Sequence, residues 1–309
     1  MLPQKTAEGG TLTFELKRQT SAFEKLGRRR FNPFDRPSHT KLSDGEIFID
    51  LRRRFPQNWA HFLNNHLPMC FAMMNHLDLT PQQILLILPG KTPGYIVQAA
   101  DFFGFRSLCT SNSVEGLGIE FDMEPWIGVR SVRADLVKLP MVTAILNEQR
   151  ANWHDTDSLP EKVFLSRRKT RALENEAEVE AHLAKDGYVK IYPEDLSTLG
   201  QLMLFEHAER IIAIHGAGLA PLLYISENTR LRKLVEIFPC GHMTDVYRVM
   251  AQQVGCKWIG VRGKIKPEHI GPAYDLEAPF FKYSLQSFEV DLESIDLAQE
   301  MLCQEEVAY

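Results

Sequence analysis

Residues 211–221 read IIAIHGAGLAP, an apolar run that ends in a histidine and two closely spaced glycines. The run 210–214 is short and rich in β-branched residues, which predicts a buried parallel strand. Gly216 and Gly218 allow a sharp turn after it, and residues 219–224 can then begin a helix whose free N–H groups attract phosphate. The alternative is a strand-to-helix turn packed closely for steric reasons, which GAG by itself favours.

This turn does not match a dinucleotide-binding site. Such a site carries GxGxxG and opens the first βαβ unit of its domain. Here Pro221 stands at the third glycine position, and the turn lies late in the chain. The sequence therefore argues against a dinucleotide at this position.

A regular alternation of strands and helices surrounds the quoted stretch. The predicted strands are 162–165, 188–192, 210–214, 233–238 and 257–261. The predicted helices between them are 175–185, a helix capped by Ser197 that runs to 208, 217–224 and 243–254. Five strands alternating with four helices predict a doubly wound parallel sheet, which is a Rossmann-like domain.

Ligands of such a sheet bind at the carboxyl ends of its strands. The residues that follow the strands are Ser166, Arg167 and Arg168, then 193–195, then His215, Gly216, Ala217 and Gly218, with Glu236 near the end of the fourth strand. This edge is therefore expected to combine cations, carboxylates and a phosphate-compatible turn.

The first of these segments, SRRKTR at 166–171, places four cations in six positions. The guanidinium groups of Arg167, Arg168 and Arg171 could bind a diphosphate in a bidentate manner. A solvated basic loop is an equal alternative.

The N-terminal half follows a less regular pattern. Its predicted elements are a strand at 46–51, a helix at 58–77, a strand at 84–88, a helix at 95–103, an ill-defined β region to about 137 and a helix at 140–152. These place the boundary near residue 155, so the expected domains are 1–155 and 156–309. A final helix at 292–307 could pack back on the first domain.

The helix that begins NWAHFLNNHLP at 58–68 is expected to be amphipathic. At about 100° per residue, one side groups Asn58, His61, Asn64 and Asn65, and the other Trp59, Leu63, Leu67 and Cys70. A polar stripe facing an interdomain cleft would let His61 accept a proton near neutral pH. The alternative is a hydrogen-bonded structural histidine.

Composition limits the classes of protein. The chain has 309 residues and 44% hydrophobic content, which suit about two domains. A net charge of −5 argues against a nucleic-acid binder. Basic residues gather in 17–36 and 52–54, where they form solvated faces or attract an anionic membrane or glycan.

Cysteine usage and apolar patterning favour a cytoplasmic protein. The five cysteines are scattered without metal-ligand spacing, so reduced thiols are expected. No apolar stretch reaches about 18 residues, and no signal-peptide core is present at the N-terminus.

Several motifs together resemble glycosyltransferase family 61. SRR-x-x-R followed by NE, a PEDLS segment, HGAGL and VEIFP occur in the order typical of that family. Residues 45–75 also resemble its segment in which an aromatic–histidine pair precedes a leucine–proline. The positions that match are His61, Ser166, Arg167, Arg168, Asn175, Glu176, His215, Gly216, Gly218, Glu236 and Pro239.

The resemblance implies a GT-B architecture of two Rossmann-like domains and inversion at the anomeric carbon. It implies a nucleotide-sugar donor, expected to be a UDP-sugar, on the C-terminal domain and a glycan acceptor on the N-terminal one. Asn58 and Asn65 are expected on the acceptor side. Asn65 stands where many relatives carry a carboxylate, and an amide cannot act as a base. Either His61 is then the base, or the protein is inactive.

The resemblance also suggests roles at the donor edge. Gly216 and Gly218 would let the backbone approach the diphosphate, whose charge Arg167 or Arg168 would stabilise. His215 would touch phosphate or sugar, or instead hold the loop. Glu236 would bind ribose hydroxyls, or instead form a cap or an ion pair.

No obligatory metal or other cofactor is expected. Asp155 and Asp157 form a DxD pattern, but it lies in the predicted linker, and the cations of the donor edge can replace a metal. The hypothesis is therefore an inverting bacterial transferase that builds capsule or lipopolysaccharide glycan, with a glycan acceptor that can be lipid-linked. The alternatives are a UDP-sugar epimerase and a silent nucleotide- or glycan-binding module.

Overall fold

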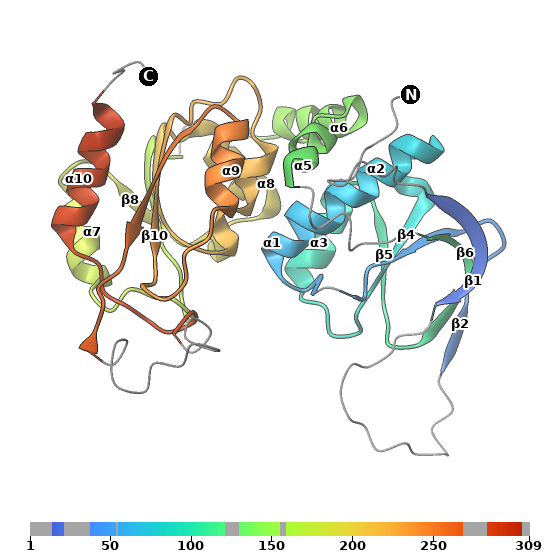
Figure 1. The fold of residues 1–309 in the computed structure, drawn as a ribbon. Coiled ribbons are helices and arrows are strands. Elements are labelled where there is room, and N and C mark those ends of the chain that lie inside the picture. Colours follow the sequence, from blue (N-terminus) through green and yellow to red (C-terminus); the bar gives the residue numbers. More distant parts are fainter. Residues whose placement is uncertain are drawn as a thin grey trace. The chain divides into compact units, whose positions relative to one another are not determined.

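The computed structural model describes residues 14–21, 38–53, 55–120, 130–154, 159–267 and 283–304. The chain divides into two compact units, Met1–Glu148 and Gln149–Tyr309, and each unit has its own sheet (Figure 1). Both units mix helices with strands, which confirms the α/β class.

The sheet of the second unit is parallel throughout. Its strands are β7 (Lys162–Leu165), β8 (Val189–Ile191), β9 (Arg210–Ile214), β10 (Lys233–Phe238) and β11 (Lys257–Arg262), in the order β11-β10-β9-β7-β8. The five strands predicted from the sequence are all present. The chain runs from β7 outward to β8 and then returns past β7 to β9, so the order of the strands reverses between β7 and β9. Loops that leave two such neighbours run in opposite directions, which opens a crevice at their carboxyl ends.

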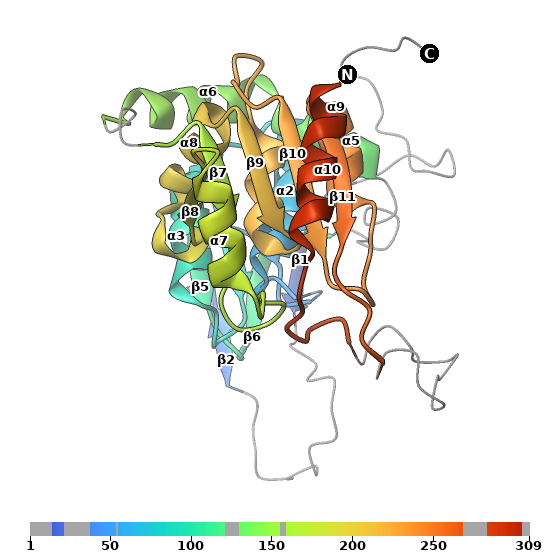
Figure 2. The ribbon, with the colours of Figure 1, turned by 90° about the vertical axis from the view of Figure 1, so that its left-hand side faces the viewer.

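Helices cover both faces of this sheet, which is why its inner strands β7, β9 and β10 are mostly apolar and buried. On one face lie α7 (Glu176–Ala184) and α10 (Leu292–Cys303), and on the other lie α8 (Thr198–His207) and α9 (Val246–Gln253) (Figures 1 and 2). The core under α7 and α10 contains Phe164, Ile212, Ile214, Val235, Ile237, Val179, Leu183 and Ile295.

The ends of two helices in this unit follow from local sequence. Ser197 caps α8 as predicted, because its hydroxyl accepts a hydrogen bond from Gly200 N at 3.0 Å. The helix expected after the quoted strand is instead the 3₁₀ helix η5 (Ala217–Tyr224). Its first bond runs from Leu219 N to Gly216 O, three residues back, as that tighter helix requires. A second 3₁₀ turn, η4 (Pro193–Asp195), follows β8.

The sheet of the first unit is mixed. Its strands are β1 (Glu15–Ser21), β2 (His39–Lys41), β3 (Ile47–Asp50), β4 (Ile84–Leu88), β5 (Arg106–Cys109) and β6 (Ser113–Glu120), in the order β1-β6-β3-β4-β5, with β2 also paired to β6. Only β1 is antiparallel to its neighbour. The sequence did not predict β1, because its long polar side chains are mostly exposed and give no apolar pattern.

The helices of the first unit largely follow prediction. They are α1 (Trp59–His61), the π-helical turn η1 (Phe62–His66), α2 (Leu67–Leu77), the 3₁₀ turn η2 (Pro81–Gln83), α3 (Gly94–Phe102), α5 (Arg130–Val137) and α6 (Pro140–Ala151). The expectation of β structure up to residue 137 is wrong at its end, where α5 lies. The final helix of the chain ends at Cys303, and residues 305–309 lie outside the described part.

No helix among the described residues is long and apolar enough to cross a membrane.

Candidate functional site

The predicted donor edge is held together by Arg167. This arginine follows β7, and its Nη1 donates a hydrogen bond to the carbonyl of His215, which follows β9, at 2.8 Å. The bond therefore spans the point where the strand order reverses. A Cβ atom added to Gly216 would lie 1.9 Å from Arg167 Nη1, so the missing side chain of this glycine makes room for the guanidinium.

Gly218 makes room in the same way for a different neighbour. A Cβ atom at this position would lie 2.7 Å from Cγ of Pro193 and 3.5 Å from Cδ2 of Leu165. Steric packing, the alternative that GAG favoured in the sequence, therefore accounts for both glycines. A contact of the Gly216–Ala217–Gly218 backbone with diphosphate stays a prediction.

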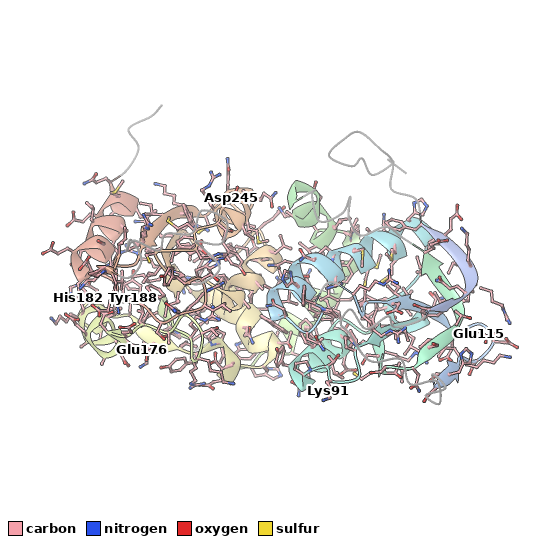
Figure 3. The ribbon with its side chains drawn as sticks, turned by 60° about the horizontal axis from the view of Figure 1, so that its bottom comes forward. Lys91, Glu115, Glu176, His182, Tyr188 and Asp245 are labelled. Carbon is pink, nitrogen blue, oxygen red and sulfur yellow. The ribbon has the colours of Figure 1, made fainter. Side chains whose placement is uncertain are left out.

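Ser166 has a structural role in this unit. It is buried, and its hydroxyl donates to Glu176, the first residue of α7, which is labelled in Figure 3. Tyr192 donates to the same carboxylate at 3.0 Å. Asn175 exchanges two hydrogen bonds with the backbone of Val290. The serine, asparagine and glutamate of the family pattern thus anchor the start of α7.

Arg168 is already paired with a carboxylate. It donates to both oxygens of Asp195 at 2.6 and 2.7 Å, and it lies 3.9 Å from the centre of the Tyr192 ring. The hydrogen bonds with Asp195 raise the pKa of Arg168 and lower that of Asp195. A phosphate would have to compete with this bidentate pair for the guanidinium.

Arg167 and Arg171 differ from Arg168, because neither forms an ion pair within the described part of the chain. Arg167 Nη2 donates to Thr170, and Arg171 Nε donates to the carbonyl of Ser284 at 2.6 Å. Both side chains are half-buried, and burial lowers the pKa of each. Glu194 acts on Arg167 electrostatically, but among the described residues neither arginine has a carboxylate in direct contact, and such a pair of cations can accommodate an anionic ligand.

The backbone at Arg171 is itself unusual, since its φ of 60° lies in the left-handed region. A non-glycine residue in that region costs about 1–3 kcal/mol, and such residues concentrate at functional sites. The surrounding hydrogen bonds hold the residue in place, because Arg171 N donates to the carbonyl of Leu285 at 3.1 Å.

His215 and Glu236 form a buried pair beneath these cations. Nδ1 of His215 lies 2.6 Å from Oε1 of Glu236, and Nε1 of Trp258 donates to the other carboxyl oxygen at 2.8 Å. The Glu236 side chain is 0% exposed. The contact with His215, rather than ribose binding, therefore accounts for Glu236 in this structure, because both of its oxygens already have partners away from solvent.

Burial also decides the charge of this pair. It lowers the pKa of His215, with smaller contributions from Arg171 and Arg167, and it raises the pKa of Glu236 to about 8. The pair can hold its two protons in two ways: as a neutral Glu236 acid that donates to Nδ1 of a neutral His215, or as a Glu236 carboxylate beside a charged His215. Both forms have no net charge. Desolvation favours the neutral form. The pair therefore adds no negative charge to offset the arginines.

His242 and Tyr247 complete the cluster around His215. Their rings lie 5.3 and 5.9 Å from the His215 ring. Burial, followed by the charge of Arg171, lowers the pKa of His242 to about 4. Neither residue was predicted from the sequence: His242 follows the end of β10 by four residues, whereas Tyr247 lies on α9.

The second candidate site is in the first unit, at His61. This side chain is exposed, and its backbone N–H donates to Oδ1 of Asn58 at 3.2 Å, so Asn58 is the helix cap. Asn65 Nδ2 lies 2.8 Å from His61 Nδ1. The predicted neighbours Asn58, His61 and Asn65 are therefore brought together.

Asn64 departs from the predicted polar stripe. It is only 4% exposed, and His66 is fully buried. The reason is the π-helical turn at Phe62–His66, which has more residues per turn than an α-helix and so rotates the following side chains. Single π turns inside α-helices are frequent at functional sites.

The contact with Asn65 determines which nitrogen of His61 can act as a base. With the amide group of Asn65 donating to Nδ1, a neutral imidazole carries its proton on Nε2. If the amide is turned so that its oxygen faces Nδ1–H, Nε2 becomes the proton acceptor. Base catalysis through Nε2 requires this second orientation of the Asn65 amide. A carboxylate at position 65 could only accept a hydrogen bond, so it would keep the proton on Nδ1 and leave Nε2 as the base.

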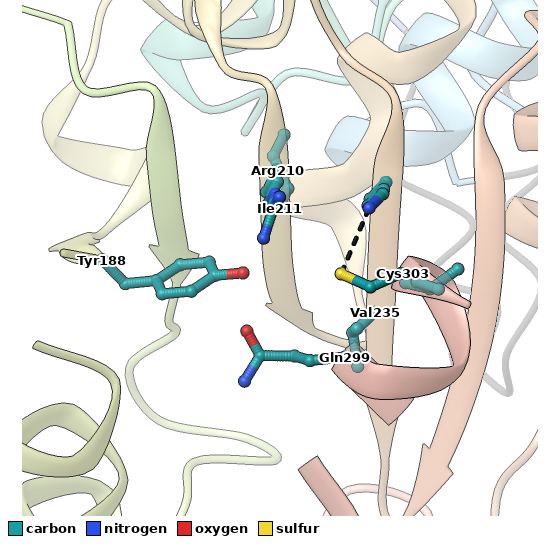
Figure 4. Close-up of a pocket in the computed structure, with 8 residues that line it drawn as sticks. Tyr188, Arg210, Ile211, Val235, Gln299 and Cys303 are labelled. Atoms are coloured by element: carbon teal, nitrogen blue, oxygen red, sulfur yellow. Dashed lines mark hydrogen bonds between the residues drawn. The ribbon is translucent and has the colours of Figure 1, made fainter. Parts of the chain in front are cut away.

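The cavity in Figure 4 lies at the opposite, amino-terminal edge of the parallel sheet. It measures about 10 Å³, room for a single water, and is lined by Tyr188, Arg210, Ile211, Lys233, Val235, Gln299, Leu302 and Cys303. An open hollow of about 530 Å³ shares four of these residues. Neither contains a predicted site residue.

No cluster of histidine, cysteine, aspartate and glutamate within the described residues could hold a metal ion. Asp155 and Asp157 lie outside the described residues, so the absence of an obligatory metal stays a prediction.

Comparison with known proteins identifies one family. The family model described as Glycosyltransferase 61 matches residues 59–231, which is more than half of the chain. No curated protein matches the chain. The matched range includes His61, Arg167, Arg171 and the turn at Gly216, and it ends before Glu236.

Gly218→Ala should destabilise the second unit. The added methyl would overlap the ring of Pro193, which cannot rotate away, so we expect a loss of about 1–3 kcal/mol in the free energy of unfolding. Chemical denaturation measures this loss. Gly94→Ala is the matched control, because a Cβ there would meet nothing within 4 Å. Equal stability of the two variants would contradict the packing role of Gly218.

Glu236→Gln should change how stability depends on pH. The folded pKa of Glu236 is raised from 4.5 to about 8, so its contribution is complete below pH 4.5 and is lost as pH rises through 8. Glutamine imitates the neutral acid and does not titrate. From about pH 5 to about pH 9, the wild-type Tm should fall relative to the variant by roughly 2–8 °C. Parallel Tm curves would contradict a neutral Glu236.

Proposed function

The chain belongs to glycosyltransferase family 61, and from this membership we propose that it is an inverting enzyme that transfers a sugar from a nucleotide-sugar to a glycan acceptor. The family establishes glycosyl transfer. The observation that carries the finer proposal is the pair of half-buried guanidinium groups, Arg167 and Arg171, at the reversal point of a parallel sheet.

A diphosphate fits these two arginines by charge. The charge of Arg171 raises the cost of the charge on Arg167, and it also contributes to the lowered pKa of His215 and His242. A bound anion would relieve all of these interactions together. His215, whose Nδ1 is occupied by Glu236, would contribute Nε2 to the phosphate or sugar.

The same two arginines would assist departure of the nucleoside diphosphate. Charge develops on the leaving phosphate as the glycosidic bond breaks, and fixed guanidinium groups stabilise it without reorganisation. Protein cations would therefore replace a metal ion, and we propose that none is obligatory. Arg168 would contribute less, because Asp195 already neutralises it.

On the acceptor side, we propose His61 as the general base. It would take the proton of an acceptor hydroxyl as the oxygen attacks the anomeric carbon from the face opposite the leaving group, so a single displacement inverts the configuration. Asn65 would orient the imidazole by accepting from Nδ1–H. Asn58 would support the helix start rather than chemistry, since it caps the helix.

For the biological setting, we propose a UDP-sugar donor and a bacterial surface polysaccharide, capsule or lipopolysaccharide, as product. The enzyme would act at the cytoplasmic face of the membrane, on an acceptor that can be lipid-linked. The basic N-terminal region would provide peripheral contact, and most of it, residues 22–37, lies outside the described part. These proposals rest on the family and on the charge pattern of the sequence.

Separate alanine substitutions of Arg167, Arg171 and Arg168 test the donor site. We expect Arg167→Ala and Arg171→Ala each to weaken UDP binding by roughly 10- to 100-fold, because each removes from a charged ligand a cation that has no ion pair among the described residues. Arg168→Ala is the matched control and should weaken it less than about threefold. Isothermal titration calorimetry measures all three affinities.

A larger effect of the Arg168→Ala substitution than of Arg167→Ala and Arg171→Ala on UDP affinity would refute this assignment.

Product analysis with a panel of UDP-sugars distinguishes the transferase from its alternatives. A sugar converted without an acceptor would identify an epimerase, and binding without turnover would identify a silent module.

Substitutions at His61 and Asn65 test the base. His61→Ala should lower turnover by a factor of roughly 10² to 10⁴ while UDP affinity stays the same. Asn65→Asp should keep activity and move the acidic limb of the pH–rate profile to higher pH, because a carboxylate stabilises the imidazolium. Initial rates measured across pH reveal both effects. Near-native turnover of a folded His61→Ala protein would exclude the role.

A further inference from the structure

Phe55, just before the His61 helix, is exposed to an unusual degree. Its side chain is 74% exposed, the largest fraction among the large apolar side chains that the structure describes. Contact of a phenyl ring with water is unfavourable, and isolated cases on protein surfaces need no explanation. Phe55 differs from an isolated case because two further observations concern the same residue.

The backbone of Phe55 is in a strained conformation. Its φ of 57° lies in the left-handed region, which bulky residues rarely adopt. The conformation is held by a turn in which Asn58 N donates to the carbonyl of Phe55 at 3.0 Å. A glycine or an asparagine would adopt this φ with less strain, so neither the turn nor solvation accounts for phenylalanine at this position.

The Phe55 ring lies beside the proposed base. Its centre is 6.4 Å from the centre of the His61 ring, and the two planes are inclined by 35°. His61 in turn contacts Asn65 through Nδ1. An exposed apolar ring therefore lies beside an imidazole, and the imidazole in turn contacts an amide.

A pyranose ring has the complementary surface. One of its faces presents a set of axial C–H bonds, which are weakly positive and pack against the negative face of an aromatic ring, while its hydroxyls point outward. The hydroxyls next to a stacked ring would meet His61 and Asn65. The other nearby aromatic side chain is less available, because Tyr95 packs edge-on against Trp59 and donates to the carbonyl of Gln57.

We propose that Phe55 is a stacking platform for a pyranose ring of the glycan acceptor, and that it positions an acceptor hydroxyl at His61. The assignment of the sugar as acceptor rests on the proposed function. The stacking surface itself rests on the exposure and strain of Phe55 and on its distance from His61.

Binding of simple sugars to the full chain tests the platform. The probes are methyl β-glucopyranoside, methyl β-galactopyranoside and methyl α-mannopyranoside at millimolar concentration, observed by saturation-transfer NMR. Wild-type protein should transfer saturation to the C–H protons on one face of at least one probe. Phe55→Ala should reduce that transfer roughly three- to tenfold, Phe55→Trp should restore it, and Leu297→Ala, at another exposed apolar residue that lies in α10, should leave it unchanged.

Stability distinguishes a platform from a structural residue. Phe55→Gly removes both ring and strain, so it should lose sugar binding while its Tm equals or exceeds that of the wild type. A lower Tm for Phe55→Gly, binding that persists in Phe55→Ala, or wild-type protein that binds none of the three probes would each overturn the proposal.

The outcome is separable from that of the proposed function. UDP affinity and product formation are measured on the same proteins. Sugar binding that depends on Phe55 in a protein without transferase activity would leave the platform intact and refute the enzyme. Transfer that is unaffected by Phe55→Ala would refute the platform alone.

Discussion

The hydrogen bond from Arg167 to the carbonyl of His215 is the constraint on which the second unit's candidate site depends. It joins the ends of two strands whose connections run in opposite directions, so it crosses the crevice that a parallel sheet opens at such a point. Gly216 must lack a side chain because the guanidinium fills that space. The bond uses one nitrogen of Arg167, and the group still forms no ion pair in the part of the chain that the structure describes.

Burial of charge explains the electrostatic character of this edge. Glu236 could have neutralised the arginines, but its oxygens are held by His215 and Trp258 in a position without solvent, where the neutral acid is favoured. Arg168 is neutralised instead by Asp195 at the surface. Among the described residues, Arg167 and Arg171 keep a positive charge without an ion pair, and the proposal of an anionic donor rests on them.

In the first unit, local irregularities of the backbone determine where the side chains around His61 lie. The π turn after His61 sends Asn64 into the core and leaves Asn65 against the imidazole. The left-handed Phe55 then presents its ring beside His61. A prediction based on 3.6 residues per turn includes neither irregularity. It therefore grouped His61 with Asn65, as the structure does, but placed Asn64 on the wrong side of the helix.

The sequence by itself determined the parallel sheet of the second unit, the long helix at His61, the cap at Ser197 and the family, because these depend on short apolar runs, glycine stops and motifs within a few residues of one another. Only the tertiary structure decided which arginine is paired, that Glu236 is buried and that α5 lies at the end of the region expected to be β structure. Arg168 meets Asp195 27 residues away, and Arg171 meets Ser284 113 residues away. Charge and accessibility depend on such distant contacts, whereas local patterning fixes only secondary structure.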